Sequence, residues 1–401
     1  MKNNFDRIVD RRGTCCLKWD SVPPVKVDGE VLPLWVADMD FAAAPCIREA
    51  MQKRLDHGVF GYEEVPEGWY EAAIRWFASR HGWTMRREEI LYTTGVVPGI
   101  SAVIKAFTEP GDGVVVMTPV YNHFFSSIRN NGCEPICCPL AEASGPRYEI
   151  DFEALERGCA DPRAKILLLC NPHNPAGRIW SREDLEKVAE MARRRSLLVI
   201  SDEIHCEIVR PGRHYVPMAT VDPSNCITLF SPSKSFNIAG LQMAGIWSDN
   251  PEWRRKVNRA ININEICDVN PFAPVAGIAA YSDEGAAWLE ELNAYFQDNY
   301  LMLKEKMAEK APAFPVFELE ATYLAWIDCR VLGMRSEDIE KELLKREKVW
   351  VNAGEMYGVE GFIRVNMATS RALLSEGLDR MIRGLSALPG DGNMHKNSQK
   401  R

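Results

Sequence analysis

The feature that most narrows the possible folds of this chain is an alternation of apolar, strand-like runs with an amphipathic, helix-like run. Residues 165–170 (Lys-Ile-Leu-Leu-Leu-Cys) and 197–200 (Leu-Leu-Val-Ile) have the largely continuous apolar character of buried strands. Between them, apolar residues recur at helical spacing over 185–192. This order of strand, helix and strand predicts a parallel sheet that is covered on both faces, with right-handed crossover connections.

Further runs extend this pattern along the chain. The helix is predicted to begin after Ser181, because Ser181 and Asp184 together have the spacing of a capping box. Other strand-like runs lie at 89–92, 113–118, 226–231, 322–327 and 361–365. The last two of these runs, with amphipathic helices between and after them, indicate a smaller α+β domain.

The predicted fold is therefore α/β, with a large domain built on a mostly parallel central sheet that helices cover on both faces, plus a smaller α+β domain. We expect the segment 1–45 to contribute to the small domain and its part around residues 34–41 to run over both domains. The large domain is expected over 46–290, the rest of the small domain over 291–388, and a disordered tail over 389–401.

Composition excludes some classes of function. The 401 residues are 46% hydrophobic and 26% charged with a net charge of −8, which is ordinary for a soluble protein and disfavours nucleic-acid binding. No apolar run is long enough to span a membrane, and residues 1–6 lack the apolar core of a signal peptide, so we expect a cytoplasmic protein.

The cysteines do not predict a metal site. There are 12 cysteines, and the adjacent pairs at 15–16 and 137–138 do not form a CxxC pattern. We expect them to be small buried side chains without disulfides. His205 and Glu207 lack the cysteine partners of a zinc deaminase, so no metal is expected.

Lys234 is the most informative single residue. It lies in Ser-Pro-Ser-Lys-Ser-Phe-Asn, residues 231–237, directly after a strand-like run, where α/β sheets place their chemistry. A desolvated lysine loses its proton easily and can form a Schiff base. The alternative is a surface lysine in a serine-rich turn, because lysine is usually exposed.

Four other residues lie in or after strand-like runs. Asp202 could keep an aromatic nitrogen protonated, or it could be a helix N-cap. Asn174 could donate to a phenolate oxygen, or it could only shape a turn with its neighbouring prolines. Gly95 before a helix could expose backbone N–H groups to a phosphate. Arg364 could bind a carboxylate or form an ordinary salt bridge. A parallel sheet would bring such residues together at its carboxyl edge.

Motifs extend over nearly the whole chain, about residues 5–385. They are Leu-Trp-Val-Ala-Asp-Met-Asp-Phe (34–41), Gly-Tyr (61–62), Thr-Thr-Gly-Val-Val-Pro-Gly (93–99), Thr-Pro-Val-Tyr (118–121), Asn-Pro-His-Asn-Pro-Ala-Gly (171–177), Ser-Asp-Glu-Ile-His (201–205), the lysine motif at 231–237 and Gly-Phe-Ile-Arg (361–364). In this order they resemble the fold-type I pyridoxal-phosphate enzymes of the class I/II aminotransferase superfamily. Within it, the chain is similar to the cystathionine β-lyase/cystalysin-type C–S lyase branch.

The resemblance implies catalytic roles for Lys234, Tyr121 and Asp202. Lys234 would hold pyridoxal 5′-phosphate as a Schiff base and move the substrate Cα proton. Asp202 would pair with the cofactor's ring nitrogen, and Tyr121 would stack on the ring. Asn174 would hydrogen-bond the ring's 3-oxygen with His205 close by, although many aminotransferases have a tyrosine in place of this histidine.

The resemblance also implies binding residues for the cofactor phosphate and the substrate. The phosphate would be held by Gly95, Val96, Ser231 and Ser233 of the same chain. Tyr62 of the partner subunit would reach it as well, which implies a homodimer. The substrate would be bound by Arg364 at its carboxylate, with Ala37, Asp38, Tyr62 and Tyr121 nearby.

Two positions depart from the pattern or vary within it. Gln242 stands where many aminotransferases of this superfamily have an arginine that contacts the phosphate, and this favours the C–S lyase branch. His123 lies where the family varies, and it could line the substrate pocket or belong to a surface loop.

The resulting hypothesis is a β-eliminating C–S lyase that cleaves cystathionine or related cysteine S-conjugates to a thiol, pyruvate and ammonia. One alternative is an aminotransferase, because both reactions use the same cofactor site. A second alternative is a regulatory binding protein with residual lyase activity.

Overall fold

A seven-stranded sheet lies at the centre of the larger part of the molecule, in the order β2-β10-β9-β8-β7-β3-β4. The computed structural model describes residues 3–263 and 268–389. All strands run parallel except β10, which is antiparallel to both of its neighbours. The strands are β2 (Ile90–Thr93), β3 (Gly113–Thr118), β4 (Glu134–Pro139), β7 (Ala164–Cys170), β8 (Leu198–Asp202), β9 (Cys226–Phe230) and β10 (Ala244–Trp247).

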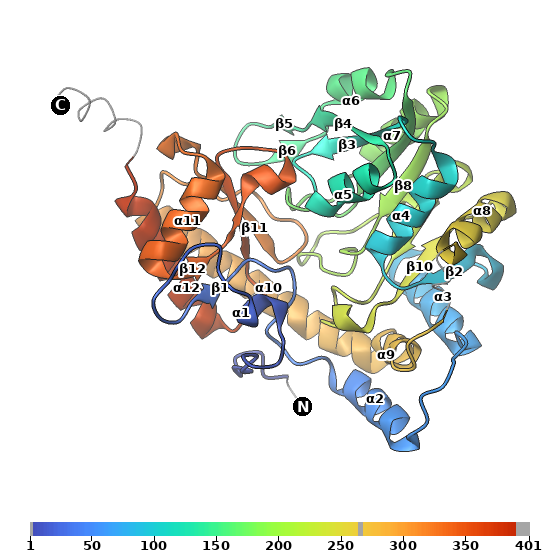
Figure 1. Cartoon of the computed structure of the whole chain (residues 1–401), viewed down its shortest axis with the longest axis horizontal. Coiled ribbons are helices and arrows are strands. Elements are labelled where there is room, and N and C mark those ends of the chain that lie inside the picture. The colour runs from blue at the N-terminus through green and yellow to red at the C-terminus, as the bar shows by residue number, and fades with distance from the viewer. Residues whose placement is uncertain (1–2, 264–267, 390–401) are drawn as a thin grey trace.

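Helices cover both faces of this sheet, as predicted (Figure 1). Because successive side chains of a strand point to opposite faces, Val114 and Val116 pack in one apolar cluster and Val115 and Met117 in another. The first cluster includes α4 (Val96–Phe107), α5 (Asn122–Asn130) and α8 (Pro251–Asn262). The second includes α3 (Glu67–His81), α6 (Phe152–Cys159), α7 (Arg182–Arg194) and α9 (Ala273–Ala280).

A smaller antiparallel sheet, β11-β14-β13, lies in the other part of the molecule, beside the C-terminal helices (Figure 1). Its elements are β11 (Leu324–Asp328), β13 (Asn352–Ala353), β14 (Phe362–Asn366), α11 (Ser336–Glu347) and α12 (Arg371–Ala387). The N-terminal segment joins this part, because β1 (Leu32–Pro33) pairs in parallel with β12 (Val349–Trp350). The remaining elements are α1 (Leu17–Asp20), α2 (Pro45–His57), β5 (Ala141–Glu142) and β6 (Tyr148–Glu149).

The long helix α10 (Asp283–Lys310) connects the two parts. Its first half, with Trp288 and Phe296, packs in the core of the large part, and its second half, with Leu303 and Met307, packs in the core of the small part. The helix therefore runs without a break through residue 290, where the large domain was predicted to end. The division into domains stays a prediction.

Several local predictions can be compared with the structure. The capping box of Ser181 and Asp184 at the start of α7 is confirmed, with both reciprocal hydrogen bonds present. β11 begins at Leu324, two residues later than predicted, because Thr322 has a positive φ of 69°. The prediction that cysteines are buried is wrong for Cys15 and Cys137, which are exposed.

Residues 390–401, which make up nearly all of the predicted tail, lie outside the described residues. Within the part of the chain that the structure describes, no helix is both long and apolar enough to cross a membrane.

Candidate active site

A cavity of about 190 Å³ lies at the carboxyl ends of the parallel strands. Gly95, Tyr121, Asn174 and Asp202 reach it from the ends of β2, β3, β7 and β8, and Lys234 follows β9. The full lining is Ala37, Gly95, Val96, Val97, Pro98, Tyr121, Cys170, Asn174, Asp202, Ile204, His205, Ser233, Lys234 and Ala239. Residues scattered over 203 positions of the sequence thus meet because parallel strands end at one edge.

Lys234 reaches into this cavity from the turn after β9. Its Nζ donates a hydrogen bond of 2.5 Å to the main-chain carbonyl of Ala37. Burial lowers the pKa of Lys234 to about 8, and the nearby charge of Arg364 acts in the same direction, whereas Asp38 and Asp202 oppose the shift. About a tenth of the Lys234 side chains would therefore be the neutral, nucleophilic amine at pH 7, far more than for an ordinary lysine.

Asp202 ends β8 and is buried. Its Oδ1 accepts one hydrogen bond, from the Ile204 main-chain N–H at 3.1 Å. Burial raises the pKa of this carboxyl to about 7, although the Ile204 N–H and the charge of Lys234 oppose the shift. A cation placed beside Asp202 would therefore be strongly favoured, because it would relieve the cost of burying the carboxylate.

Arg364 is not part of the cavity lining, but it is hydrogen-bonded to Asn174, which is. Arg364, on β14, donates from Nη1 to Asn174 Oδ1 at 3.1 Å and from Nη2 to the carbonyl of Trp35 at 3.0 Å. A guanidinium can only donate, so it fixes the amide oxygen of Asn174 toward itself. The amide NH₂ group of Asn174 is left to donate to another acceptor, as a bond to a phenolate oxygen requires.

His205 and Tyr121 complete the walls around these polar groups. Burial lowers the pKa of His205 to about 3, helped by the charges of Lys234 and Arg364, so its imidazole is neutral. Burial raises the pKa of Tyr121, so its phenol also stays neutral. Both rings therefore present uncharged surfaces to whatever occupies the cavity.

The end of the cavity next to β2 is formed by the start of α4. Gly95 is the N-cap residue, with a φ of 154° that side-chain-bearing residues rarely adopt, and no side chain caps the helix. The first N–H groups of α4 can therefore bind an anion. Ser233 lies on the cavity wall, whereas Ser231 lies behind it and donates from Oγ to the carbonyl of Met243 at 2.6 Å.

Other predicted residues lie outside the cavity lining. The Asp38 carboxylate points to Arg11, and Gln242 is exposed at the end of a short turn. His123 is exposed in the first turn of α5, and its ring lies 5.2 Å from that of Tyr121. Tyr62 is 94% exposed and does not line the cavity of its own chain.

The structure adds residues that the sequence did not indicate. The Tyr323 hydroxyl donates to the Ala37 carbonyl at 3.0 Å, beside Lys234. Asn237 and Asn366 hold the main chain of residues 36–41. Both asparagines follow a predicted functional residue closely in sequence, but their bonds are made to a segment 196 to 330 positions away, which no local pattern reveals.

A second buried polar cluster surrounds Glu207, on the side of α3. Its carboxylate accepts hydrogen bonds from Trp76 Nε1 at 2.7 Å, from Arg80 Nε at 2.9 Å and from the His81 ring at 2.6 Å. His81, Cys206 and Glu207 also have ligand atoms within 4.8 Å of one another. Because Glu207 is already bound by these donors, the cluster is an ion-pair anchor between α3 and the segment after β8.

The polar groups of the cavity fit pyridoxal phosphate. His205 Nδ1 and Arg364 Nε are buried and have no hydrogen-bond partner in the described part of the chain. Asp202 is suited to a pyridinium nitrogen, Asn174 to a phenolate oxygen, and the start of α4 to a phosphate. Together these groups correspond in kind to the ring nitrogen, the phenolate oxygen and the phosphate of the cofactor.

Comparison with known proteins agrees with this geometry. The family described as aminotransferase class I and II matches residues 30–381. Cystathionine beta-lyase PatB of Bacillus subtilis is 40% identical over 388 residues, which cover 96% of this chain and all of that protein. The structure of cystalysin from Treponema denticola, which contains a pyridoxal 5′-phosphate cofactor, has a TM-score of 0.90 at 33% identity and covers 96% of this chain and 99% of that one.

A third comparison gives the same result. The pyridoxal-phosphate-bound C–S lyase from Staphylococcus hominis has a TM-score of 0.89 at 32% identity, over 96% of this chain and 99% of that one. The fold, the residues of the cavity and the extent of these matches together show that this chain belongs to the aminotransferase class I and II family of pyridoxal-phosphate-dependent enzymes, with the fold-type I architecture.

Proposed function

We infer that this protein is a pyridoxal-phosphate-dependent C–S β-lyase that converts cystathionine or a related cysteine S-conjugate to a thiol, pyruvate and ammonia. The observation that carries this proposal is the meeting of Lys234, Asp202 and Asn174 in one cavity, with Arg364 bonded to Asn174. Relatives named cystathionine beta-lyase and C–S lyase support it over nearly the whole chain.

When bound, pyridoxal phosphate supplies an electron sink that stabilises negative charge on the substrate Cα. Lys234 would hold the cofactor and, when released, take the Cα proton on Nζ, for which a pKa near 8 is suitable. Asp202 would keep the ring nitrogen protonated, and Asn174 would donate to the 3-oxygen. Arg364 would orient the substrate carboxylate with its guanidinium fork.

The phosphate would be held by the N–H groups at the start of α4 and by the serines of the lysine motif. Gln242 carries no charge and is exposed, so we propose that hydrogen bonds supply most of the phosphate's binding energy. The absence of a cation at position 242 favours the lyase over the aminotransferase, in line with the sequence pattern.

The proposal is tested with L-cystathionine and no added keto acid. We expect homocysteine, pyruvate and ammonia in equal amounts from the wild-type holoenzyme. A Lys234→Ala variant should lose turnover by about 10²–10⁴-fold, because the group that moves the proton is removed. Product formation is followed with a thiol reagent and a pyruvate-coupled assay.

An aminotransferase would give a different pattern of products. It would need an added keto acid as acceptor, and it would convert the cofactor to its amine form when an amino donor is supplied alone. Transfer of amino groups to a keto acid, without thiol or pyruvate from cystathionine, cystine or an S-alkylcysteine, would overturn the lyase proposal.

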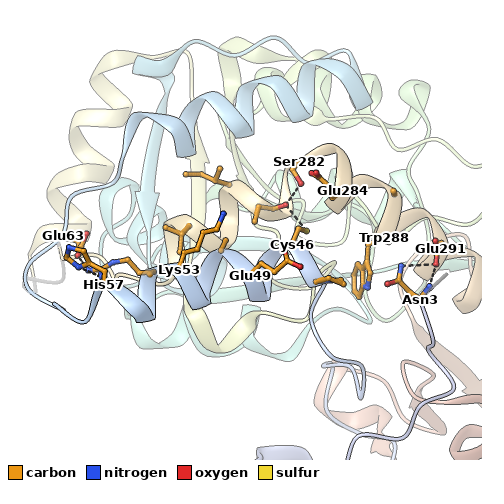
Figure 2. Close-up of a pocket in the computed structure, with 17 residues that line it drawn as sticks. Asn3, Cys46, Glu49, Lys53, His57, Glu63, Ser282, Glu284, Trp288 and Glu291 are labelled. Carbon is orange, nitrogen blue, oxygen red and sulfur yellow. Dashed lines mark hydrogen bonds and ion pairs between the residues drawn. The ribbon is translucent and has the colours of Figure 1, made fainter. Parts of the chain in front are cut away.

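We also propose a homodimer in which Tyr62 of the partner subunit completes each site. The segment around the end of α2 exposes Leu55, Val59, Phe60 and Tyr62, each at least 50% accessible. Beside it lies a cavity of about 1190 Å³ between α2, α9 and α10, with charged side chains such as Lys53 and Glu284 (Figure 2). This cavity is distinct from the cavity around Lys234. Its size and the exposed apolar side chains beside it are suited to contact with the surface of a second subunit.

Sedimentation at working concentration should therefore report a dimer, and a fully active monomer would contradict this proposal.

We further propose a cytoplasmic location, because the described cysteines are free thiols rather than disulfides. Cell fractionation tests that location.

A further inference from the structure

The segment from Trp35 to Phe41, of which Ala37 lines the active-site cavity, is held almost entirely by side chains from elsewhere. Its carbonyls accept hydrogen bonds from Arg364 and Asn352 (at Trp35), Asn366 (at Val36 and Asp38), Lys234 and Tyr323 (at Ala37), Arg11 and Asn237 (at Met39) and Asn237 (at Phe41). No regular secondary structure fixes this segment, so its position depends on these side chains.

The Ala37 carbonyl is the point at which this segment touches the chemistry. Its oxygen lies 2.5 Å from Lys234 Nζ. The neighbouring carboxylate of Asp38 also acts on Lys234 through its charge, and it favours the protonated form of that amine. Displacement of residues 37–38 would therefore change both the orientation and the proton affinity of Lys234.

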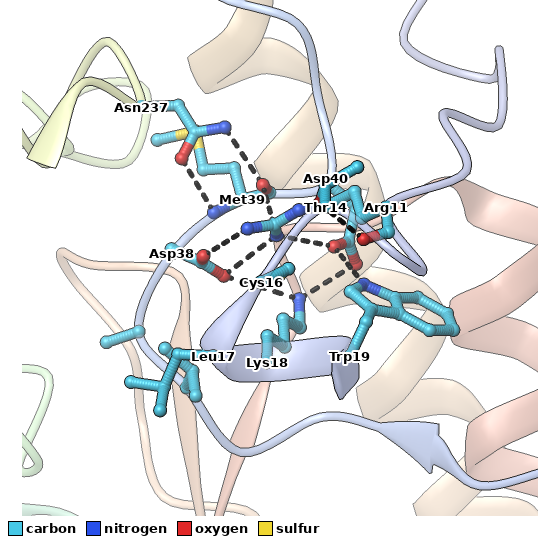
Figure 3. Close-up of polar contacts among 12 residues, drawn as sticks. Arg11, Thr14, Cys16, Leu17, Lys18, Trp19, Asp38, Met39, Asp40 and Asn237 are labelled. Atoms are coloured by element: carbon cyan, nitrogen blue, oxygen red, sulfur yellow. Dashed lines mark hydrogen bonds and ion pairs between the residues drawn. The ribbon is translucent and has the colours of Figure 1, made fainter. Parts of the chain in front are cut away.

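A cluster of alternating charges also holds the same segment (Figure 3). Arg11 binds the Asp38 carboxylate through both terminal nitrogens, at 3.1 and 2.5 Å, and donates to Asp40 at 2.9 Å. Lys18, which is buried on α1, donates to Asp40 at 2.8 Å, as does Trp19 Nε1. We refer to Arg11, Lys18, Asp38 and Asp40 as the N-terminal clamp.

The clamp is balanced in charge, with two cations and two carboxylates, and little of it is exposed. Lys18 is 1% exposed and Asp40 is 4% exposed. Burial alone would raise the pKa of Asp40, but the charges and hydrogen bonds of Lys18, Trp19 and Arg11 outweigh it and lower that pKa. Breaking one partner of such a buried pair leaves the other uncompensated, so each member depends on the rest.

We propose that Arg11 and Lys18 are positioning residues for Lys234: by binding Asp38 and Asp40, they keep the Ala37 carbonyl within hydrogen-bond distance of Lys234 Nζ. Residues 11–20 thus hold residues 38–40 in place, and with them the Ala37 carbonyl that lines the active site. This inference rests on the proposed role of Lys234 as the cofactor-binding lysine.

The experiment uses the full-length holoenzyme with Arg11→Met, Arg11→Lys and Lys18→Met variants. Exposed Arg7 in the same segment supplies the matched control, Arg7→Met. We expect Arg11→Met to lower kcat with cystathionine by about 10²-fold with little change in KM, because the misplaced group acts on the reacting atoms rather than on substrate binding. Arg11→Lys should recover part of this loss, since it keeps the charge but not the fork.

A second readout does not depend on turnover. The pH midpoint of the bound cofactor's visible absorbance reports the proton affinity of the nitrogen that Lys234 contributes. In Arg11→Met, the Asp38 charge is no longer compensated, so this midpoint should rise by about half a pH unit or more. Arg7→Met should leave both kcat and the midpoint at their wild-type values.

Variants that unfold at lower temperature but keep wild-type kcat and absorbance midpoint would overturn the proposal, because the clamp would then only stabilise the fold. If Lys18→Met does not fold, the comparison of Arg11→Met with Arg11→Lys still tests whether the clamp positions Lys234. Full turnover by Lys234→Ala would remove the role of Lys234 itself, and the clamp proposal with it. That failure is recognised in the Lys234 variant alone, before any clamp variant is made.

Discussion

Two buried carboxylates, Asp202 at the end of β8 and Glu207 in the segment that follows it, have completely different surroundings. Asp202 and Glu207 are each 3% exposed. Asp202 accepts one hydrogen bond, from a main-chain N–H, and burial raises its pKa to about 7. Glu207 accepts hydrogen bonds from three side chains, and its pKa is lowered because His81, Arg80 and Trp76 together outweigh the effect of burial.

We interpret this difference as one between a site that a cofactor can occupy and a structural ion-pair cluster. Glu207 has its partners within the chain, so the protein alone stabilises its charge. Asp202 has almost none, and it shares the cavity with the unpartnered Nδ1 of His205. Buried polar groups are normally satisfied, so the groups around Asp202 are those that a bound cofactor can complete.

The largest expected effect is on catalysis at Asp202. Asp202→Asn keeps the shape but removes the charge that would hold the ring nitrogen protonated, so kcat should fall by about 10²–10³-fold. Stability should not fall, because a poorly partnered buried carboxylate is removed. Steady-state kinetics and thermal unfolding of the same preparation check both parts. Near-normal turnover would show that Asp202 is only structural.

The next effect is on stability at Glu207. Glu207→Gln breaks a buried ion-pair cluster and should lower the free energy of unfolding by about 3 kcal/mol, with kcat per folded molecule retained. The matched control is Glu290→Gln, because Glu290 is 73% exposed and only 3.9 Å from Arg80. That control should change stability by no more than about 0.5 kcal/mol. An equal loss of unfolding free energy in both variants would show that Glu207 contributes no more to stability than an exposed carboxylate.

The smallest effect is the opposite pH dependence of the two groups in cofactor-free protein. The folded pKa of Asp202 is raised to about 7, so the folded state binds the extra proton, and stability should rise as pH falls from about 7 to about 4. Relative to Asp202→Asn, wild type should gain about 2 kcal/mol between pH 8 and pH 5, as measured by urea denaturation.

Glu207 should behave in the reverse sense. Its folded pKa is lowered, so its contribution is present above the ordinary glutamate pKa and is lost as pH falls through the folded value. Wild type should therefore lose its advantage over Glu207→Gln only below about pH 4. Parallel pH profiles for the two comparisons would contradict the assignment of different roles.

Much of this protein could be predicted from its sequence. The strands around the cavity are continuous apolar runs, and their alternation with helices is sufficient to predict the parallel sheet and its functional edge. β4 and β10 were not predicted, because Pro135 and Pro139 in β4 and Gly245 in β10 are residue types that are depleted in strands. Motifs such as the one around Lys234 could be recognised because their residues are close together in sequence.

The sequence by itself determined the fold class and the family resemblance, and it predicted the residues that would carry the chemistry, because these depend on local spacing and residue type. Only the tertiary structure decided which buried carboxylate is satisfied and how residues 35–41 are held. Those properties depend on contacts such as Arg11 with Asp38, Asn366 with Asp38 and Arg80 with Glu207. Such contacts join residues far apart in the chain, and burial and electrostatic environment arise only when the chain has folded.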